Sequence, residues 1–262
     1  MSGRVNPRIW NLIGIVIVLI GVVLFLPPYP QDPGYHVFAD TRLVCYVPRF
    51  GDVVSNIAFV SVGLLGLWAL TGVRARVIFK RPLDAVPYLT FYAGVALTGF
   101  GSAYYHWEPT TDRLFWDRLP MTLAFTSLTA AFVADRLDQT IGVTRVLPIL
   151  AAIGVTSLLY WRWTESVGAG DLRLYGLIQF GPFIFLPALN RLFPDRCYTD
   201  GRFLFAMIVV YGLAIFLEKA DHQVFELTGG LISGHTLKHF FAGAACLGPL
   251  AMLQNTRVTM KT

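Results

Sequence analysis

Charged residues are scarce in this sequence. Asp, Glu, Lys and Arg make up 14% of the 262 residues, whereas hydrophobic residues make up 55%, and the mean hydropathy is +0.58. A soluble domain carries about 25% charged residues. The chain therefore lacks the polar surface that would keep it in water, and its composition predicts an integral membrane protein.

Cysteine is also scarce, and Cys45, Cys197 and Cys246 form no paired motif. The spans assigned below put Cys45 and Cys197 on opposite sides of the membrane, which argues against a disulfide framework. The net charge is +5, but the basic residues are scattered over short loops and form no stripe with interleaved aromatic residues. The sequence therefore does not indicate a nucleic-acid partner.

Long apolar runs are abundant. A membrane-spanning helix needs roughly 17–25 mostly apolar residues, and eight runs meet or nearly meet this length. The longest connection between them, 27–52, is rich in Pro and Gly and is expected to fold over the outer face. The fourth and seventh runs are short, so we expect their polar ends to extend into the membrane interface. The eight expected spans are 9–26, 53–72, 84–105, 119–134, 144–161, 174–193, 203–218 and 235–253.

The first span resembles a signal peptide in one respect, because Arg4 and Arg8 precede it. Its apolar stretch is longer than the usual h-region of about 7–15 residues, and no A-x-A cleavage site follows. We therefore expect an uncleaved helix.

The basic residues give the orientation, because cytoplasmic loops carry the excess of Lys and Arg. With the N-terminus in the cytoplasm, thirteen basic residues lie inside and seven outside, with Lys238 left aside at the start of the last span. Both termini are therefore predicted to be cytoplasmic. The inside residues are Arg4, Arg8, Arg74, Arg76, Lys80, Arg81, Arg136, Arg145, Arg191, Arg196, Arg202, Arg257 and Lys261. The outside residues are Arg42, Arg49, Arg113, Arg118, Arg162, Arg173 and Lys219.

Two histidines open the last span. His235 and His239 are four residues apart, so they would lie on one face of a helix, about one turn apart. A helix offers two imidazoles to one metal ion with this spacing. Taken alone, the pair is equally consistent with two ligands of one metal ion and with two histidines at the membrane interface.

A second polar group falls at the same predicted depth. Ser102 and His106 repeat the spacing at the outer end of the third span, and Asp117 stands at the expected start of the fourth, with Pro120 in its first turn. Polar residues inside a membrane are costly and usually face the bundle interior or a cavity. We therefore expect these side chains to meet the two late histidines.

Such a group predicts hydrolytic metal chemistry. Three imidazoles leave an open fourth position on Zn²⁺, as catalytic zinc sites do. Asp117 would act as general base and Ser102 as a donor to the oxyanion. Alternatives stay open: Ser102 as a small residue for close helix packing, and Asp117 as a partner of Arg118 or Arg113, as a charge at a helix N-terminus, or as a fourth metal ligand.

In order along the chain, SxxxH (Ser102 to His106), an aspartate eleven residues later (Asp117) and a late HxxxH (His235 to His239) resemble the alkaline ceramidase family. That family belongs to a wider group of membrane hydrolases that includes adiponectin-receptor-like and lipid-remodelling proteins. The likeness covers about residues 50–245, including "GDVVSNIAF" at 51–59.

The resemblance implies an all-α integral membrane protein with a seven-transmembrane-helix core at 51–255. Residues 1–50 would add one N-terminal transmembrane helix and an outer loop. His106, His235 and His239 would hold Zn²⁺ toward the extracytoplasmic face. Ser102 and Asp117 would be catalytic, and the reaction would cleave the amide of a ceramide-like membrane lipid into a fatty acid and a long-chain base.

The chain departs from this family before the first core span. Animal ceramidases bind calcium there through an acidic segment, but here Arg42 and Arg49 lie among Asp40 and Asp52. Calcium is therefore not expected. We expect one of the two arginines to pair with one of the aspartates and to hold the outer loop down.

Three further residues precede or enter the last span. Asp221 would orient a ligand histidine, and His222 would substitute for a ligand that does not bind. Lys238 would either reach the membrane interface or pair with Asp221 or Glu218.

Two other functions compete with ceramide hydrolysis. One is hydrolysis of a different lipid amide or ester. The other is a non-enzymatic zinc-binding receptor or transporter. However, a structural zinc site usually has four protein ligands, and a transporter would spread polar groups across the bilayer.

Overall fold

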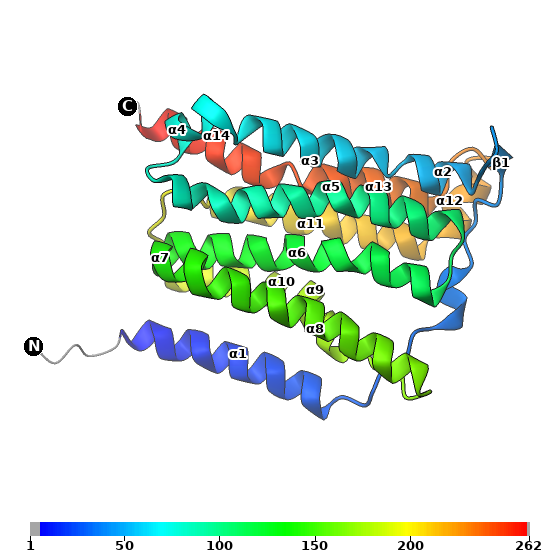
Figure 1. The fold of residues 1–262 in the computed structure, drawn as a ribbon, viewed down its shortest axis with the longest axis horizontal. Helices are drawn as coiled ribbons and strands as arrows, with labels where there is room; N and C mark the ends of the chain where they lie inside the picture. The colour runs from blue at the N-terminus through cyan, green and yellow to red at the C-terminus, as the bar shows by residue number, and fades with distance from the viewer. Residues whose placement is uncertain (1–5, 261–262) are drawn as a thin grey trace, which may run out of the picture.

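The structure, a computed structural model, describes residues 6–260 and is almost entirely helical (Figure 1). The elements of the first half are α1 (Pro7–Phe25), the 3₁₀ helix η1 (Pro33–His36), β1 (Leu43–Val44), β2 (Val47–Pro48), α2 (Phe50–Val54), α3 (Ile57–Ala69), α4 (Gly72–Ile78), the 3₁₀ helix η2 (Pro82–Ala85), α5 (Val86–Trp107) and α6 (Thr111–Arg136). Those of the second half are α7 (Gln139–Ile141), the π-helical turn η3 (Gly142–Val146), α8 (Leu147–Ser166), α9 (Arg173–Phe180), α10 (Pro182–Leu192), α11 (Gly201–Lys219), α12 (Asp221–Leu227), α13 (Gly234–Ala245) and α14 (Gly248–Met260).

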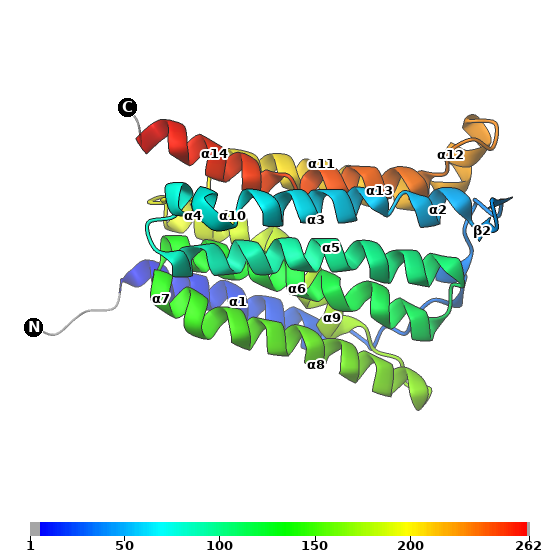
Figure 2. The ribbon, with the colours of Figure 1, turned by 45° about the horizontal axis from the view of Figure 1, so that its top comes forward.

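The long helices run along a common axis, and α1 lies at one side of the bundle, against α9 and α10 (Figures 1 and 2). Helix α1 begins and α14 ends at the same end of the bundle, which we call the terminal end. The opposite end carries α2, α12 and the strands β1 and β2, and we call it the hairpin end. The arrangement therefore has two distinct ends, as a membrane-spanning bundle requires.

Within residues 6–260, five helical segments are long and apolar enough to cross a membrane, which indicates a multi-pass membrane protein. Helices α5 and α6 are long enough to cross a membrane but are more polar than these five segments. The expected span 174–193 is divided at Gly181 into two shorter helices, α9 and α10. The all-α membrane class is thus confirmed, whereas the count of seven core spans stays a prediction. The five segments are Pro7–Phe25, Phe50–Ala69, Gln139–Ser166, Gly201–Lys219 and Gly234–Thr256.

Helix α6 begins earlier than the sequence pattern suggested. The side chain of Thr110 accepts a hydrogen bond from the amide of Arg113 at 3.2 Å, so Thr110 caps the helix as an N-cap threonine does. Asp117 therefore lies within α6, and Pro120 is inside the helix. The expectation that these two residues open the helix is wrong, because hydropathy does not detect a polar first turn.

Pro120 also explains how closely α5 and α6 pack. Proline has no N–H, so the carbonyl of Trp116 lacks its usual helical donor. Gly101 of α5 lies against this carbonyl, and a Cβ at position 101 would clash with it. The close approach places the next residues of the two helices, Ser102 and Asp117, beside each other.

The C-terminal end of α1 is tied to the loop before α9. Arg173 donates to the carbonyl of Leu24 at 3.3 Å and to that of Leu26, and the amide of Leu172 donates to the carbonyl of Tyr29 at 2.8 Å. A cation at a helix C-terminus also stabilises the helix dipole. The Arg173 guanidinium hydrogen-bonds Asp171 and lowers the pKa of that carboxyl to about 2.

The connection between α1 and α2 folds over the hairpin end, as expected from its length and composition. Phe38 and Asp40 in it are buried, and β1 and β2 form a two-residue antiparallel hairpin. Cys45 and Tyr46 form its turn with positive φ angles. Cys45 is free, as are the other two cysteines, in agreement with the sequence prediction. We call residues 27–49 the strap.

The substitution Gly101→Ala is expected to lower the free energy of unfolding by about 1–3 kcal/mol, because α5 and α6 must separate to admit the methyl group. The matched control is Gly212→Ala in α11, where a Cβ meets nothing within 4 Å. This control is expected to leave stability unchanged or slightly raised. Unfolding of both variants in mixed micelles would measure the difference, and equal stabilities would contradict the close packing.

Candidate metal centre

Three histidines converge at the hairpin end. His106 comes from the last turn of α5, and His235 and His239 come from the first two turns of α13. One ring nitrogen from each lies within 4.8 Å of the others, and the Nε2 atoms of His106 and His235 are 3.1 Å apart. All three side chains are buried. The convergence predicted from the spacing is therefore confirmed.

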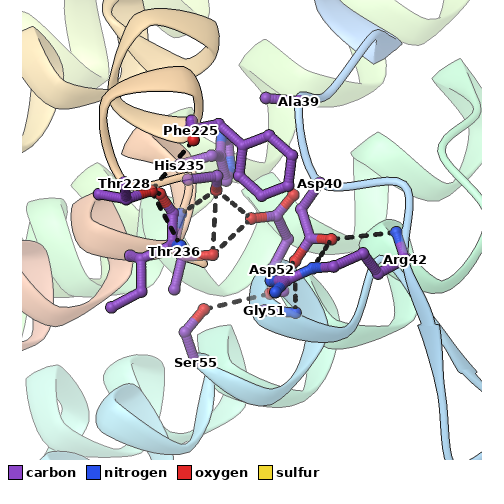
Figure 3. A network of polar contacts seen from close by, with 12 residues as sticks. Ala39, Asp40, Arg42, Gly51, Asp52, Ser55, Phe225, Thr228, His235 and Thr236 are labelled. Carbon is purple, nitrogen blue, oxygen red and sulfur yellow. Dashed lines mark hydrogen bonds and ion pairs between the residues drawn. The ribbon is translucent and has the colours of Figure 1, made fainter. Parts of the chain in front are cut away.

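A buried carboxylate fixes the start of α13. The hydroxyls of Ser233 and Thr236 donate to Oδ1 of Asp52 at 2.8 and 2.9 Å (Figure 3). Ser233 also caps α13 by accepting from the amide of Thr236 at 2.9 Å. The first turn of α13, which carries His235, is thereby joined to α2.

Asp221 supports the cluster through the backbone. Its carboxylate accepts from the amide of His235 at 2.7 Å and from the amide of Ala39 in the strap at 2.9 Å. Asp221 thus positions a candidate ligand, but through the main chain and not through the imidazole. His222 is exposed, and it is absent from the histidine cluster found among the described residues. The structure therefore does not bring His222 to the site.

Ser55 sets the orientation of the third imidazole. Nδ1 of His239 lies 2.7 Å from the Ser55 hydroxyl, which itself donates to the carbonyl of Asp52 at 3.3 Å. The hydroxyl oxygen is then free to accept the Nδ1 hydrogen, which leaves the lone pair of His239 on Nε2. Partners of this kind orient metal-binding histidines.

Aromatic rings cover the cluster. The ring centroid of Phe38 in the strap lies 4.7 Å from those of His106 and His235, and that of Phe59 lies 5.8 Å from His239. Phe38 thereby covers the histidines on the hairpin-end side, whereas Phe59 lines the cavity beside His239.

The nearest two imidazoles have the spacing of ligands to one transition-metal ion. In a tetrahedral site with metal–nitrogen bonds of 2.0–2.1 Å, the ligand nitrogens lie about 3.3 Å apart. The separation of 3.1 Å between His106 and His235 is close to that value, and two Nε2 atoms at this distance cannot both carry hydrogens. An all-imidazole set suits zinc, copper, iron or nickel. Nδ1 of His106 is buried and has no hydrogen-bond partner.

An elongated cavity of about 160 Å³ leads away from the cluster. Its lining residues on α11 run from Leu204 to Glu218, about 21 Å along the helix axis. Those on α5 run from Phe91 to Ser102, about 16 Å. Most of the walls are apolar, and His239 lies at the polar end. The cavity is therefore long and mostly apolar, with its polar groups gathered at one end.

Ser102 and Asp117 lie at the polar end of this cavity. The Ser102 hydroxyl lies near the Asp117 carboxylate. Asp117 belongs to none of the ion pairs found in the described part of the chain, and Arg113 pairs with Glu108 instead. The alternative of an ion pair between Asp117 and Arg113 or Arg118 is therefore wrong.

Lys238 also reaches the cavity. Its Nζ atom donates to Glu218 at 2.6 Å, and the hydroxyl of Tyr35 in the strap donates to the same carboxylate oxygen at 3.1 Å. The expected pairing of Lys238 with Glu218 is confirmed. Because the lysine is neutralised inside the bundle, it does not extend to the interface.

The strap carries the other expected ion pair. Arg42 donates to Asp40 through Nε at 2.8 Å and Nη2 at 2.7 Å, and Asp40 also accepts from the amide of Gly51 at 2.9 Å (Figure 3). Arg49 donates to the carbonyl of Trp107 at 3.2 Å. The prediction that an arginine pairs with an aspartate and holds the loop down is confirmed for Arg42 and Asp40.

Sequence reasoning missed the contacts of Asp52 and Phe38. A signal for Asp52 was present in "GDVVSN", where Asp52 and Ser55 repeat at helical spacing at the start of an apolar span. Phe38 offered no signal, because one aromatic residue in a connection rich in Pro and Gly has no distinctive pattern.

No family model, curated protein or solved structure matches this chain. The fold and the site define a multi-pass, all-α membrane protein with a buried cluster of three histidines that could hold a metal ion. The resemblance to alkaline ceramidases thus depends on the sequence motifs described above, which contain Ser102, His106, Asp117, His235 and His239 and the segment 51–59.

The substitution Ser55→Ala is expected to weaken zinc binding roughly 10–100-fold, because Nδ1 of His239 loses its acceptor. Competition with a fluorescent chelator would measure the affinity of the purified protein. Ser166→Ala is the control, because Ser166 is exposed and bonds only the carbonyl of Trp163. Equal zinc affinities for Ser55→Ala and the wild type would show that this hydrogen bond does not support zinc binding.

Proposed function

We propose that this protein is a zinc-dependent integral membrane amidase that hydrolyses the N-acyl amide bond of ceramide-like lipids. The observation that carries the proposal is a buried three-histidine cluster beside Ser102 and Asp117, at the polar end of an apolar cavity. The products would be a fatty acid and a long-chain base.

His106, His235 and His239 would hold the zinc ion. When bound, zinc polarises a carbonyl oxygen and lowers the pKa of a water molecule to about 7. Asp117 is not part of the cluster of ligand atoms found among the described residues. This favours an open coordination position, which a catalytic site needs.

Asp117 would carry the proton in this reaction. Its carboxylate takes a proton from the attacking water, whose oxygen forms the new bond to the acyl carbon. As the carbon–nitrogen bond breaks, Asp117 gives the proton to the departing amine. Both product groups are then complete, and Asp117 is again ionised.

Ser102 would stabilise the negative charge that develops on the amide oxygen. Its hydroxyl lies near Asp117 before reaction, and rotation about the bond between Cβ and Oγ redirects the hydrogen toward the substrate. The close packing at Gly101 holds both side chains in place for these steps.

The apolar cavity would bind the acyl chain and exclude water from it. Its walls include Phe91, Leu128 and Met207. Two polar residues also line it, and Nε2 of Gln179 donates to the hydroxyl of Tyr211 at 3.0 Å, so part of their polarity is met within the protein.

The terminal end would face the cytoplasm and the histidine cluster would face the extracytoplasmic side. The strongest support is the basic excess predicted for the inside loops. Arg4 and Lys261, which count toward it, lie outside the described residues. The start of α1 and the end of α14 share one end of the bundle (Figure 1), as two termini on the same side require.

Purified protein is expected to release fatty acid from ceramide only in the presence of zinc. His239→Ala should abolish zinc binding and turnover together. Asp117→Asn should keep zinc but lower kcat by about 100-fold or more, because the proton acceptor is lost. Mass spectrometry of the products and metal analysis of each variant would test both expectations.

The matched control for Asp117→Asn is Asp112→Asn on the same helix. Asp112 is exposed and pairs with Arg162 at 2.8 Å, so this variant should retain wild-type turnover. Activity that persists after complete metal removal would refute the proposal. Zinc flux in liposomes without lipid turnover would favour the receptor or transporter alternative.

A further inference from the structure

Arg118 is a buried cation without a counter-charge. It follows Asp117 on α6, lines the cavity and is 7% exposed. Its Nη1 atom is buried and has no hydrogen-bond partner among the residues that the structure describes. None of the ion pairs formed within residues 6–260 includes it.

Three aromatic rings surround the guanidinium. Its Cζ atom lies 4.7 Å from the ring centroid of Trp161, 5.0 Å from that of Tyr175 and 5.5 Å from that of Tyr35. Such rings attract a cation through their faces. They do not replace the in-plane acceptors that the five N–H groups of a guanidinium require. The rings therefore position Arg118 but leave its donors available.

The walls around Arg118 are themselves fixed. Nε1 of Trp161 donates to Glu165 at 3.0 Å, and the hydroxyl of Tyr35 donates to Glu218 at 3.1 Å. Both carboxylates are thus already used by other donors. The guanidinium occupies a rigid setting, which is what selective recognition of a ligand group needs.

The acidic groups nearest in the cavity do not pair with Arg118. Glu218 forms its ion pair with Lys238, and none of the ion pairs within residues 6–260 joins Asp117 to Arg118. A buried charge is normally paired, so the open donors of Arg118 suit an anionic group of a ligand. The planar fork of arginine matches the two oxygens of a carboxylate or phosphate.

We propose that Arg118 binds an anionic group of the substrate, so that the preferred substrate is an amide lipid with a carboxylate or phosphate close to the scissile bond. This inference rests on the proposed amidase function and narrows its substrate class. Arg118 follows the proposed general base, Asp117, on α6. The anionic group therefore lies on the amine side of the scissile amide bond, and the acyl chain occupies the apolar part of the cavity.

The first test compares three amides that share one acyl chain: an N-acyl amino acid, a phosphorylated ceramide and neutral ceramide. At least one anionic lipid is expected to have the higher kcat/KM. Arg118→Gln should lower the ratio of kcat/KM for that lipid over ceramide by about 30-fold or more, and Arg118→Lys should lower it less. The two anionic substrates show whether the site takes a carboxylate or a phosphate.

Arg162→Gln is the matched control. Arg162 is half-exposed, pairs with exposed Asp112 and does not line the cavity, so the same loss of charge there should leave the ratio unchanged. The inference is overturned if ceramide is the best of the three substrates. It is also overturned if Arg118→Gln and Arg162→Gln have the same ratio.

A binding measurement separates this inference from the proposed reaction. Metal-free protein in a non-ionic detergent should bind N-palmitoylglycine more tightly than N-palmitoylethanolamine, which has the same acyl chain and amide but no charge, and Arg118→Gln should remove the difference. If that difference is found but the zinc-loaded protein hydrolyses no amide, the reaction is refuted and the anion site stands. If the two lipids bind the wild type equally, the anion site is refuted, whether or not the protein hydrolyses amides.

Discussion

The buried carboxylate of Asp52 is the contact on which the site end of the bundle depends. It accepts the two hydroxyls that open α13 and joins that helix to α2. Asp221 and Asp40 add bonds to the backbone of His235, Ala39 and Gly51. Hydroxyl and amide groups donate the hydrogen bonds to Asp52 and Asp221, so of these three carboxylates only Asp40 has a cation, Arg42, as its partner over the described range 6–260. Arg118 is therefore not needed to hold these segments together.

Buried polar residues also explain why α5 and α6 are not among the five segments that are apolar enough to cross a membrane. Both helices are long enough to span a membrane, but their buried faces carry Ser102, His106, Asp117 and Arg118, which lowers their hydropathy. Inside a membrane such groups require partners, and the close contact at Gly101 provides the proximity that lets them interact. Two helices that look unlike membrane spans therefore carry Ser102, His106 and Asp117, whereas His235 and His239 lie on a segment apolar enough to span.

The sequence predicted the parts that follow from periodicity. Each expected span corresponds to a helix or to two helices in succession, and the histidines were placed together because i, i+4 spacing and helix depth are local properties. It failed for the start of α6, since a polar capped turn has no hydropathy signal. It also failed for the covering role of Phe38, because that contact joins segments far apart in sequence. The setting of Arg118 depends on rings from three other elements and could not be inferred from α6 alone.

The strap has a consequence for metal exchange. Phe38 lies over His106 and His235. The next two residues hold the strap down, because the amide of Ala39 donates to Asp221 and the carboxylate of Asp40 accepts from the amide of Gly51. On the hairpin-end side, an ion bound beneath Phe38 leaves only when these bonds open together, as a local unfolding event. The rate of that opening, and not only the equilibrium affinity of three imidazoles, then determines how long the ion is retained. Metal loading by this route is consequently easiest before the strap has docked, while the chain is still folding.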